Sequence, residues 1–256
     1  MRIKGNLSNI PNNSIIGFDA EWTKNYKIKN GNIPFCFSVV VLDAQTLNMN
    51  LLEDGDIYFE YIQYYCETPT EFKDLVLIAE EWISKILGVL NTCVLCGHQI
   101  SSDFSVLYNI GKAYNISSLV CLEKIRSEWK TRKKAELIHI MDTRYDITKE
   151  FLGKSRRLVD MCNDFLLDVT QPELKSSSMT KLQNIFYDMH DDNIYERIAV
   201  MNLRHSLCAI VLYWLNEKVV NVDQRRAINI NKSVYNCLNQ DFDWINSKDF
   251  SVLLDR

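Results

Sequence analysis

The sequence predicts an α/β fold in which a mixed β-sheet is flanked by helices. Short apolar runs with the length of strands alternate along the chain with longer segments whose apolar residues recur at helical spacing. The predicted order at the start is strand, strand, helix, strand, helix, which is typical of a mixed sheet. Of the 256 residues, 47% are hydrophobic, which is enough for a large packed core.

The predicted strands are short, apolar and bounded by polar or turn-forming residues. The first, residues 15–22, follows the turn-like sequence Pro-Asn-Asn-Ser. Further strands are predicted at residues 34–42, 92–96 and 137–141. Residues 57–65 are rich in tyrosine, and their pattern does not choose between a strand and another element.

The predicted helices carry apolar side chains three and four residues apart. In residues 72–90 this spacing places Leu75, Ala79, Trp82 and Ile86 on one face. Similar patterns predict helices at 103–114, 158–166, 179–189 and 194–219.

The chain divides into a main domain and a short extension. We expect residues 1–218 to form the domain. Residues 219–256 are rich in asparagine and mixed in charge, and we expect a C-terminal extension that is helical and packed on the domain.

The charge balance restricts the classes of partner. The formal net charge is −4 and the isoelectric point about 5.6, which argues against nonspecific coating of duplex nucleic acid. A small basic channel on an otherwise acidic surface remains compatible with these values. No run approaches the ~20 consecutive apolar residues of a membrane span, so no membrane partner is expected.

The cysteines and the N-terminus predict an intracellular protein, cytoplasmic or nuclear. The first residues lack the apolar core of a secretory signal. The eight cysteines are scattered and lie mostly in apolar stretches, as reduced, buried thiols do. Cys93 and Cys96 form a CxxC inside a strand-like run without a matching second pair, which favours structural thiols over a zinc or redox site.

Asp19 and Glu21 are the most informative residues of the chain. On a strand, residues two apart share one face, so the two carboxylates project together about 7 Å apart. Like charges on one face repel each other, and a cation between them would remove the repulsion. Hard oxygen ligands of this kind suit Mg²⁺ or Mn²⁺.

Asp103 follows another buried strand. The Gly-His-Gln of residues 97–99 ends that strand, and Asp103 begins the next predicted helix. An aspartate there is by default a helix cap. Together with Asp19 and Glu21, it is instead interpreted as a third carboxylate of one site.

These motifs resemble those of a known family. Residues 18–22 (Phe-Asp-Ala-Glu-Trp), and then residues 97–99 with Asp103 and Leu107, are similar to the first two motifs of the DEDD (DnaQ-like) 3′→5′ exonucleases. The Trp after the Asp-x-Glu pair looks most like the Werner-helicase exonuclease domain and the RNase D branch. The pair Asp142-Thr143 also resembles the Asp-Thr that closes a later strand in that family.

The resemblance implies a ribonuclease H-like sheet, residues 1–218 as the exonuclease domain, and a two-metal reaction. Two ions, Mg²⁺ or Mn²⁺, would lie ~3.5–4 Å apart and hold the scissile phosphate between them. Asp19 would bridge both ions, Glu21 would hold the one on the nucleophile side, and Asp103 the one on the leaving-group side. The implied substrate is the 3′ end of single-stranded DNA or RNA, and a protein partner is also compatible.

The fourth carboxylate of the family is missing from the expected helix. The best match to the Tyr-x-x-x-Asp helix places His205 at the Asp and Met201 at the Tyr. A shifted match places Cys208 at the Asp and Arg204 at the Tyr. His205 is therefore interpreted as the fourth ligand or the general base, against the alternative of a histidine hydrogen-bonded within its helix.

Other residues are open as replacements for the missing carboxylate. Glu196, Asp191 and Asp192 lie upstream and would serve if the helix had another register. A structural zinc site that uses His205 and Cys208 is a third alternative.

Four residues are assigned to substrate binding. Trp22 could stack on a base, with a core position beside the first strand as the alternative. Lys130 and Arg132 lie in the most basic stretch and could follow phosphates, with a solvated loop or helix face as the favoured alternative. His98, inside the second motif, completes the set.

Two functions remain in competition. The first is a metal-dependent 3′→5′ exonuclease, supported by Asp19, Glu21 and Asp103. The second is a catalytically degenerate relative that binds nucleic acid or a protein partner, supported by the absent fourth carboxylate.

Overall fold

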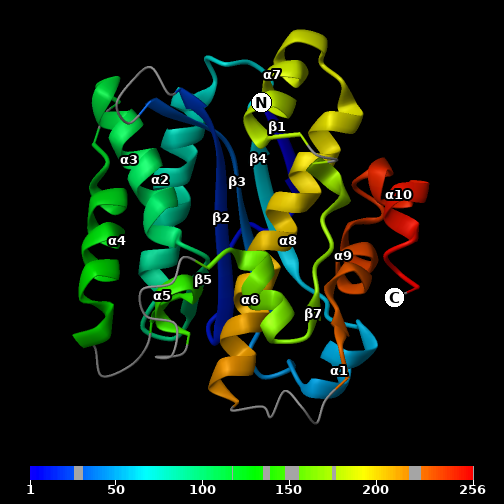
Figure 1. The fold of residues 1–256 in the computed structure, drawn as a ribbon. Coiled ribbons are helices and arrows are strands. Elements are labelled where there is room, and N and C mark those ends of the chain that lie inside the picture. The colour runs from blue at the N-terminus through cyan, green and yellow to red at the C-terminus, as the bar shows by residue number, and fades with distance from the viewer. Residues whose placement is uncertain are drawn as a thin grey trace.

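The fold is α/β, with a six-stranded mixed sheet flanked by helices (Figure 1). The computed structural model describes residues 1–25, 31–116, 118–134, 139–147, 156–174, 177–218 and 226–255. The strand order β1-β4-β3-β2-β5-β6 places β2 inside the sheet, between β3 and β5. This order is compatible with a ribonuclease H-like sheet that has one added edge strand.

The strands are β1 Arg2–Gly5, β2 Ser14–Asn25, β3 Gly31–Asp43, β4 Glu60–Tyr65, β5 Val94–Gly97 and β6 Ile140–Asp142. The pairs β1–β4, β4–β3 and β3–β2 are antiparallel, whereas β2–β5 and β5–β6 are parallel. The carboxyl ends of β5 and β6 therefore lie at the same edge of the sheet.

Three helices that follow β4 and β5 in the chain lie on one side of the sheet, where the first two pack on the strands and the third packs on those two helices. They are α2 Phe72–Val89, α3 Ile100–Ala113 and α4 Val120–Thr131. The residues of β2 that face them are apolar, and the rings of Phe18 and Phe104 lie 5.4 Å apart. This packing uses the even-numbered residues of β2, so its odd-numbered residues face the other side.

Helix α8, Asp192–Glu217, crosses the other face of the sheet (Figure 1). It is long and apolar enough to span a membrane by length and composition, but 89% of its most apolar window is buried inside the protein. Its apolar residues surround the helix because it is covered on all sides, which is typical of a core helix.

Gly17 sets how closely α8 approaches β2. A Cβ atom at this position would lie 2.4 Å from the main-chain oxygen of Ser206. Only glycine leaves room for the α8 backbone at this distance. The side chains of α8 therefore reach the carboxylates two and four residues farther along β2.

The C-terminal residues 226–255 lie against the domain. They contain β8 Ile228–Asn229, α9 Ile230–Leu238, η5 Asp243–Asn246 and α10 Lys248–Ser251. Strand β8 pairs in parallel with β7, Leu167–Asp168. Residues 219–225, at the predicted boundary, lie outside the described residues.

The remaining elements are short, apart from α7. They are α1 Met49–Asp54, η1 Arg132–Lys134, α5 Thr143–Asp146, α6 Leu158–Asp164, η3 Pro172–Leu174 and α7 Met179–Met189.

Most predicted elements are confirmed, with differences at their ends. Residues 57–65, left without a type, contain β4, and the predicted strand at 137–141 corresponds to β6 with its first two residues outside the described part. The helix predicted from Asp103 begins three residues earlier, at Ile100.

Candidate metal centre

Asp19 and Glu21 project from β2 toward α8, as the alternation of the strand predicts. Their side chains are largely covered, with exposed fractions of 13% and 17%. Two carboxylates that share a covered face need positive charge or hydrogen-bond donors around them. Helix α8 supplies both.

His205 is the α8 residue that lies between the two carboxylates. Its Nδ1 is 3.6 Å from Asp19 Oδ2 and 3.4 Å from Glu21 Oε1. One ligand atom from each of the three residues fits within 4.8 Å of the others, close enough to share one cation. The alignment that places His205 at the fourth ligand therefore agrees with its position in space.

The charges of this cluster shift the pKa values of its members. Burial raises the pKa of Glu21, and Asp19 adds to the shift while His205 opposes it. Burial alone would lower the pKa of His205, but its hydrogen bonds and charge interactions with Asp19 and Glu21 raise it to about 10. Without a metal ion, the imidazolium of His205 thus takes the place of a cation between the carboxylates.

Asn202, one turn before His205, was not predicted. Its Nδ2 donates to Asp19 Oδ2 at 2.7 Å and to the main-chain oxygen of Asp19 at 3.1 Å. The Oδ1 of Asn202 accepts from Gln63 Nε2 at 3.2 Å, which orients the amide. The i, i+3 spacing from His205 was a usable signal, because it places both residues on one face of the helix.

The ring of His205 has a second partner. Its Nε2 lies 2.7 Å from Nε2 of Gln171, just before η3. An amide can turn to donate to this nitrogen or to accept from it, so Gln171 supports either protonation state of the ring. Gln171 was also not predicted, and its distance along the chain from the other residues left no motif to find it by.

Asp103 lies in the first turn of α3 and is not the cap of this helix. Gln99 occupies the N-cap position with a left-handed φ of 60°, and the side chain of Asp103 is buried. Burial raises the pKa of Asp103 well above its usual value, and the charges of Asp19 and Glu21 add to the shift. Its Oδ2 has no hydrogen-bond partner among the described residues.

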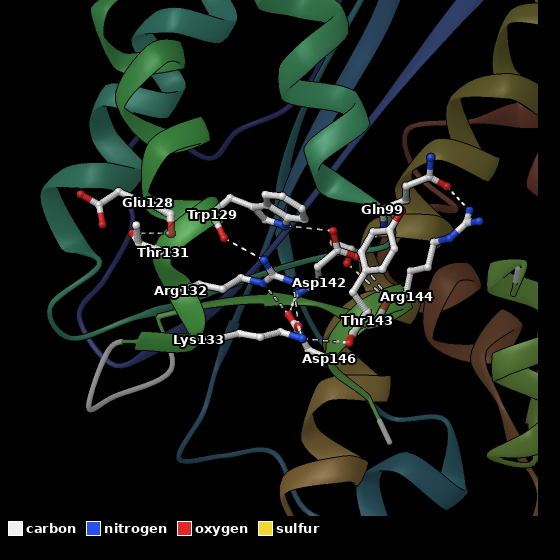
Figure 2. Close-up of polar contacts among 12 residues, drawn as sticks. Gln99, Glu128, Trp129, Thr131, Arg132, Lys133, Asp142, Thr143, Arg144 and Asp146 are labelled. Atoms are coloured by element: carbon white, nitrogen blue, oxygen red, sulfur yellow. Dashed lines mark hydrogen bonds and ion pairs between the residues drawn. The ribbon is translucent and has the colours of Figure 1, made fainter. Parts of the chain in front are cut away.

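Asp142 holds the strained turn that precedes α3. Its Oδ1 accepts from the main-chain nitrogen of Gln99 at 2.9 Å, and its Oδ2 accepts from Trp129 Nε1 at 3.0 Å. Burial raises its pKa to about 6, although these hydrogen bonds oppose the shift. Figure 2 shows Asp142 between Trp129 of α4 and the Gln99 turn. Asp142 thereby fixes the start of the helix that carries Asp103.

His98 is built into the same turn. Its two ring nitrogens lie 3.0 Å from Thr143 Oγ1 and 3.2 Å from the main-chain oxygen of Arg156. Burial lowers its pKa to about 4, and the nearby charge of His205 adds to the shift. These contacts brace the end of β5 against the end of β6.

The basic residues predicted to bind phosphate lie on α4 and η1. Arg132 forms a bidentate ion pair with Asp146, at 2.8 Å to each carboxylate oxygen, and stacks on the ring of Trp129 (Figure 2). Lys130 is exposed in the last turn of α4. No contact in the described part of the chain joins either residue to the carboxylates. Trp22 instead follows Glu21 directly and lines a groove beside it.

The other residues considered for the fourth ligand make contacts elsewhere in the fold. Asp191 caps α8 through the nitrogen of Asn193, and Asp192 pairs with Arg2. Glu196 accepts from the main-chain nitrogen of Trp244.

The cysteine alternatives are likewise structural. Cys208 is buried and lies outside the Asp19–Glu21–His205 group. Cys93 and Cys96 are buried free thiols, as predicted for this CxxC.

The donor set fits a divalent cation. Asp19 and Glu21 offer oxygen ligands and His205 offers a nitrogen, and these three ligand atoms lie within 4.8 Å of one another. Asp103 is a buried carboxyl close enough for the charges of Asp19 and Glu21 to raise its pKa, and its Oδ2 has no hydrogen-bond partner among the described residues. A mixture of carboxylate and imidazole ligands suits Mn²⁺ at least as well as Mg²⁺. Comparison of the chain with protein-family models, with curated proteins and with solved structures gave no match.

Proposed function

We propose that this protein is a metal-dependent 3′→5′ exonuclease that acts on single-stranded nucleic acid. The observation that carries the proposal is the cluster of Asp19 and Glu21 from β2 with His205 from α8, whose ligand atoms lie within 4.8 Å of one another. The buried carboxyl of Asp103 from α3 lies near enough for the charges of Asp19 and Glu21 to raise its pKa. Two largely covered carboxylates with a further buried carboxyl nearby suit a divalent cation. The short motifs that supply these residues are also those that resemble the DEDD exonucleases.

The reaction would be hydrolysis of the terminal phosphodiester bond. Water adds to phosphorus, and the bond from phosphorus to the 3′ oxygen of the preceding nucleotide breaks. The products are a nucleoside 5′-monophosphate and a strand with a new 3′ hydroxyl. Bound Mg²⁺ or Mn²⁺ would polarise the water and stabilise the leaving oxygen.

The residues of the chain would hold and orient these groups. Asp19, Glu21 and Asp103 would bind the metal, while Asn202 fixes the orientation of the Asp19 carboxylate. His205, once deprotonated, would be the fourth ligand or would take the proton of the attacking water. Asp142 and Gln99 hold the turn that presents Asp103.

A digestion assay tests the proposal. The substrates are 5′-labelled single-stranded DNA and RNA with Mg²⁺ or Mn²⁺, and Asp19→Asn is compared with the wild type. We expect 3′ shortening by the wild type and a loss of at least about 100-fold in Asp19→Asn. Asp54→Asn makes the same change at an exposed residue of α1 and should digest like the wild type. Equal digestion by Asp19→Asn would refute the proposed centre.

One observation favours the degenerate alternative. His205 and Asn202 already satisfy Asp19 without a metal ion. A folded wild type that binds no Mn²⁺ by isothermal titration calorimetry, and digests neither substrate, would establish this second function instead.

A further inference from the structure

A groove opens beside the candidate metal centre, between β2 and α7. Its volume is about 650 Å³, within the range of ligand sites. The β2 side contributes Glu21, Trp22 and Lys24. The α7 side contributes Ser178, Met179, Thr180, Lys181, Asn184, Ile185 and Asp188. Because Glu21 belongs to both, the groove is continuous with the metal centre.

Two neighbouring residues of β2 line the same groove at a point where the pairing of β2 with β3 is irregular. The register between β2 and β3 shifts between Glu21 and Trp22. In a regular strand these two side chains would point to opposite faces of the sheet. The extra residue is Phe35 of β3, because Glu21 pairs with Cys36 and Trp22 pairs with Pro34. Such a bulge increases the local twist of the paired strands, and here both Glu21 and Trp22 line one groove.

The far side of the bulge is attached to α7. The main-chain nitrogen of Lys24 donates to Thr180 Oγ1 at 3.2 Å. This contact joins β2 to the first turn of α7 and fixes the width of the groove at that end. The two walls are therefore part of one structure although they are about 155 residues apart in the chain.

The chemistry of the walls alternates between apolar and basic. Trp22, Met179 and Ile185 are partly buried and offer apolar contact area. Lys24 and Lys181 are exposed, and neither makes an ion pair with a described residue. Asp188 is the one acidic residue of the groove besides Glu21.

We propose that this groove binds the single-stranded segment that leads to the 3′ end, with a base on Trp22 and phosphates at Lys24 and Lys181. The inference rests on the proposed function for the identity of the strand, and on the groove for its path. A single strand combines flat apolar bases with a regular row of negative charges, which matches these walls.

The most basic stretch of the chain, on α4 and η1, is less suited than the groove to bind the strand. Arg132 is occupied by Asp146, and Arg126 lies over the ring of Tyr108 at 4.4 Å. Lys133 also contacts Asp146, at 3.3 Å. These three cations thus have partners within the fold, whereas the two lysines of the groove make no ion pair with a described residue.

Binding without hydrolysis tests the path. Fluorescence anisotropy with labelled dT12 and rU12 in EDTA is measured for the wild type and for the double variant Lys24→Gln/Lys181→Gln. We expect binding to weaken at least about fivefold and the slope of log K against log salt to fall by about 1.4, for two lost phosphate contacts. The double variant Lys73→Gln/Lys112→Gln, on α2 and α3, is the matched control and should bind like the wild type.

A variant of the aromatic residue tests the base contact. Trp22→Ala should weaken binding by about 5- to 100-fold, and Trp22→Phe should recover most of it, since a ring remains for stacking. Thermal melting followed by circular dichroism shows whether each variant is folded. A Trp22→Ala protein that is folded and binds normally would contradict the base contact.

The outcomes separate this inference from the proposed function. Weaker binding by the lysine variant without any hydrolysis by the wild type would support the groove and refute the exonuclease. Hydrolysis that depends on Asp19, with normal binding by the lysine variant, would refute the groove alone. The groove is equally refuted if Lys124→Gln/Lys130→Gln on α4 is the variant that weakens binding, or if the wild type binds neither oligonucleotide.

Discussion

At the scale of single residues, the candidate centre depends on how Asp19 is neutralised. Asn202 donates to it twice, and His205 lies within 3.6 Å. Both come from α8, and His205 stands at the position where the related motif carries a carboxylate. The imidazolium of His205 therefore offsets one of the two carboxylate charges, and a metal ion must compete with its proton.

The first prediction concerns Asn202. In Asn202→Asp a carboxylate replaces the amide that donates to Asp19, so two buried anions would face each other without metal. We expect the variant to be about 2–4 kcal/mol less stable in EDTA and to regain stability with Mn²⁺, because binding to the folded state stabilises it. Urea unfolding with and without Mn²⁺ measures both effects.

Asn216→Asp makes the same substitution near the end of α8, where the amide contacts only Glu217 among the described residues. It should change stability by less than about 1 kcal/mol with no dependence on metal. Equal stability of Asn202→Asp and the wild type in EDTA would show that the contact with Asp19 is unimportant.

The second prediction concerns the pH dependence of stability through His98. Its pKa is lowered to about 4 in the fold, so the unfolded chain takes up the proton first as the pH falls below about 6.5. Its contribution is constant above that pH and is lost between pH 6.5 and 4. At pH 5 the wild type should have lost about 2 kcal/mol relative to pH 7.5 from this residue.

The measurement compares urea unfolding of the wild type and His98→Gln at pH 5 and pH 7.5. Asp142, whose pKa is raised to about 6, acts in the opposite direction, but it is present in both proteins and cancels. The same pH dependence in both proteins would contradict the role given to His98.

At the scale of elements, the approach of α8 to β2 sets the geometry of the centre. In Gly17→Ala the new methyl group would meet the main-chain oxygen of Ser206, so α8 must move away from the sheet. We expect a loss of about 1–3 kcal/mol in stability and weaker Mn²⁺ binding, because His205 moves with the helix.

Gly88→Ala is the matched control. It lies within α2, and a Cβ there has no neighbour within 4 Å. Alanine should stabilise the protein by about 0.5–1 kcal/mol and leave Mn²⁺ binding unchanged. Urea unfolding and calorimetric titration measure both variants, and normal metal binding by Gly17→Ala would refute the role of the close approach.

The elements that could be predicted from the sequence are those with strong local patterns. Alternation identified β2 and placed Asp19 and Glu21 together, and helical spacing identified α2, α7 and α8. The predicted start of α3 was wrong because Gln99 occupies the N-cap position in a left-handed conformation that is rare for glutamine. Asn202 and Gln171 were missed because their roles depend on packing between elements distant in sequence.

At the scale of the whole molecule, the C-terminal residues complete the core. Ile230, Val234, Leu238 and Phe250 are fully buried, and Lys4 of β1 donates to the main-chain oxygen of Asp241. These contacts agree with an extension that packs on the domain.

The last prediction is that a chain ending at residue 218 will be poorly soluble or will melt at a much lower temperature than the full chain. Removal of residues 219–256 would expose the apolar surface that these side chains cover. Solubility after expression and a thermal melt measure the effect. A truncated chain with an unchanged melting temperature would show that the extension is dispensable.

The long sequence separation within the centre has a consequence for synthesis. Asp19 and Asn202 are 183 residues apart. As the chain leaves the ribosome, the central strand of the sheet appears early and the helix that covers it appears late, so the nascent protein has an open apolar face for most of its translation. Folding must then close a very long loop, which slows it. The candidate metal centre would therefore form only after α8 has been made, and the recovery of metal binding during refolding would measure the rate of that step.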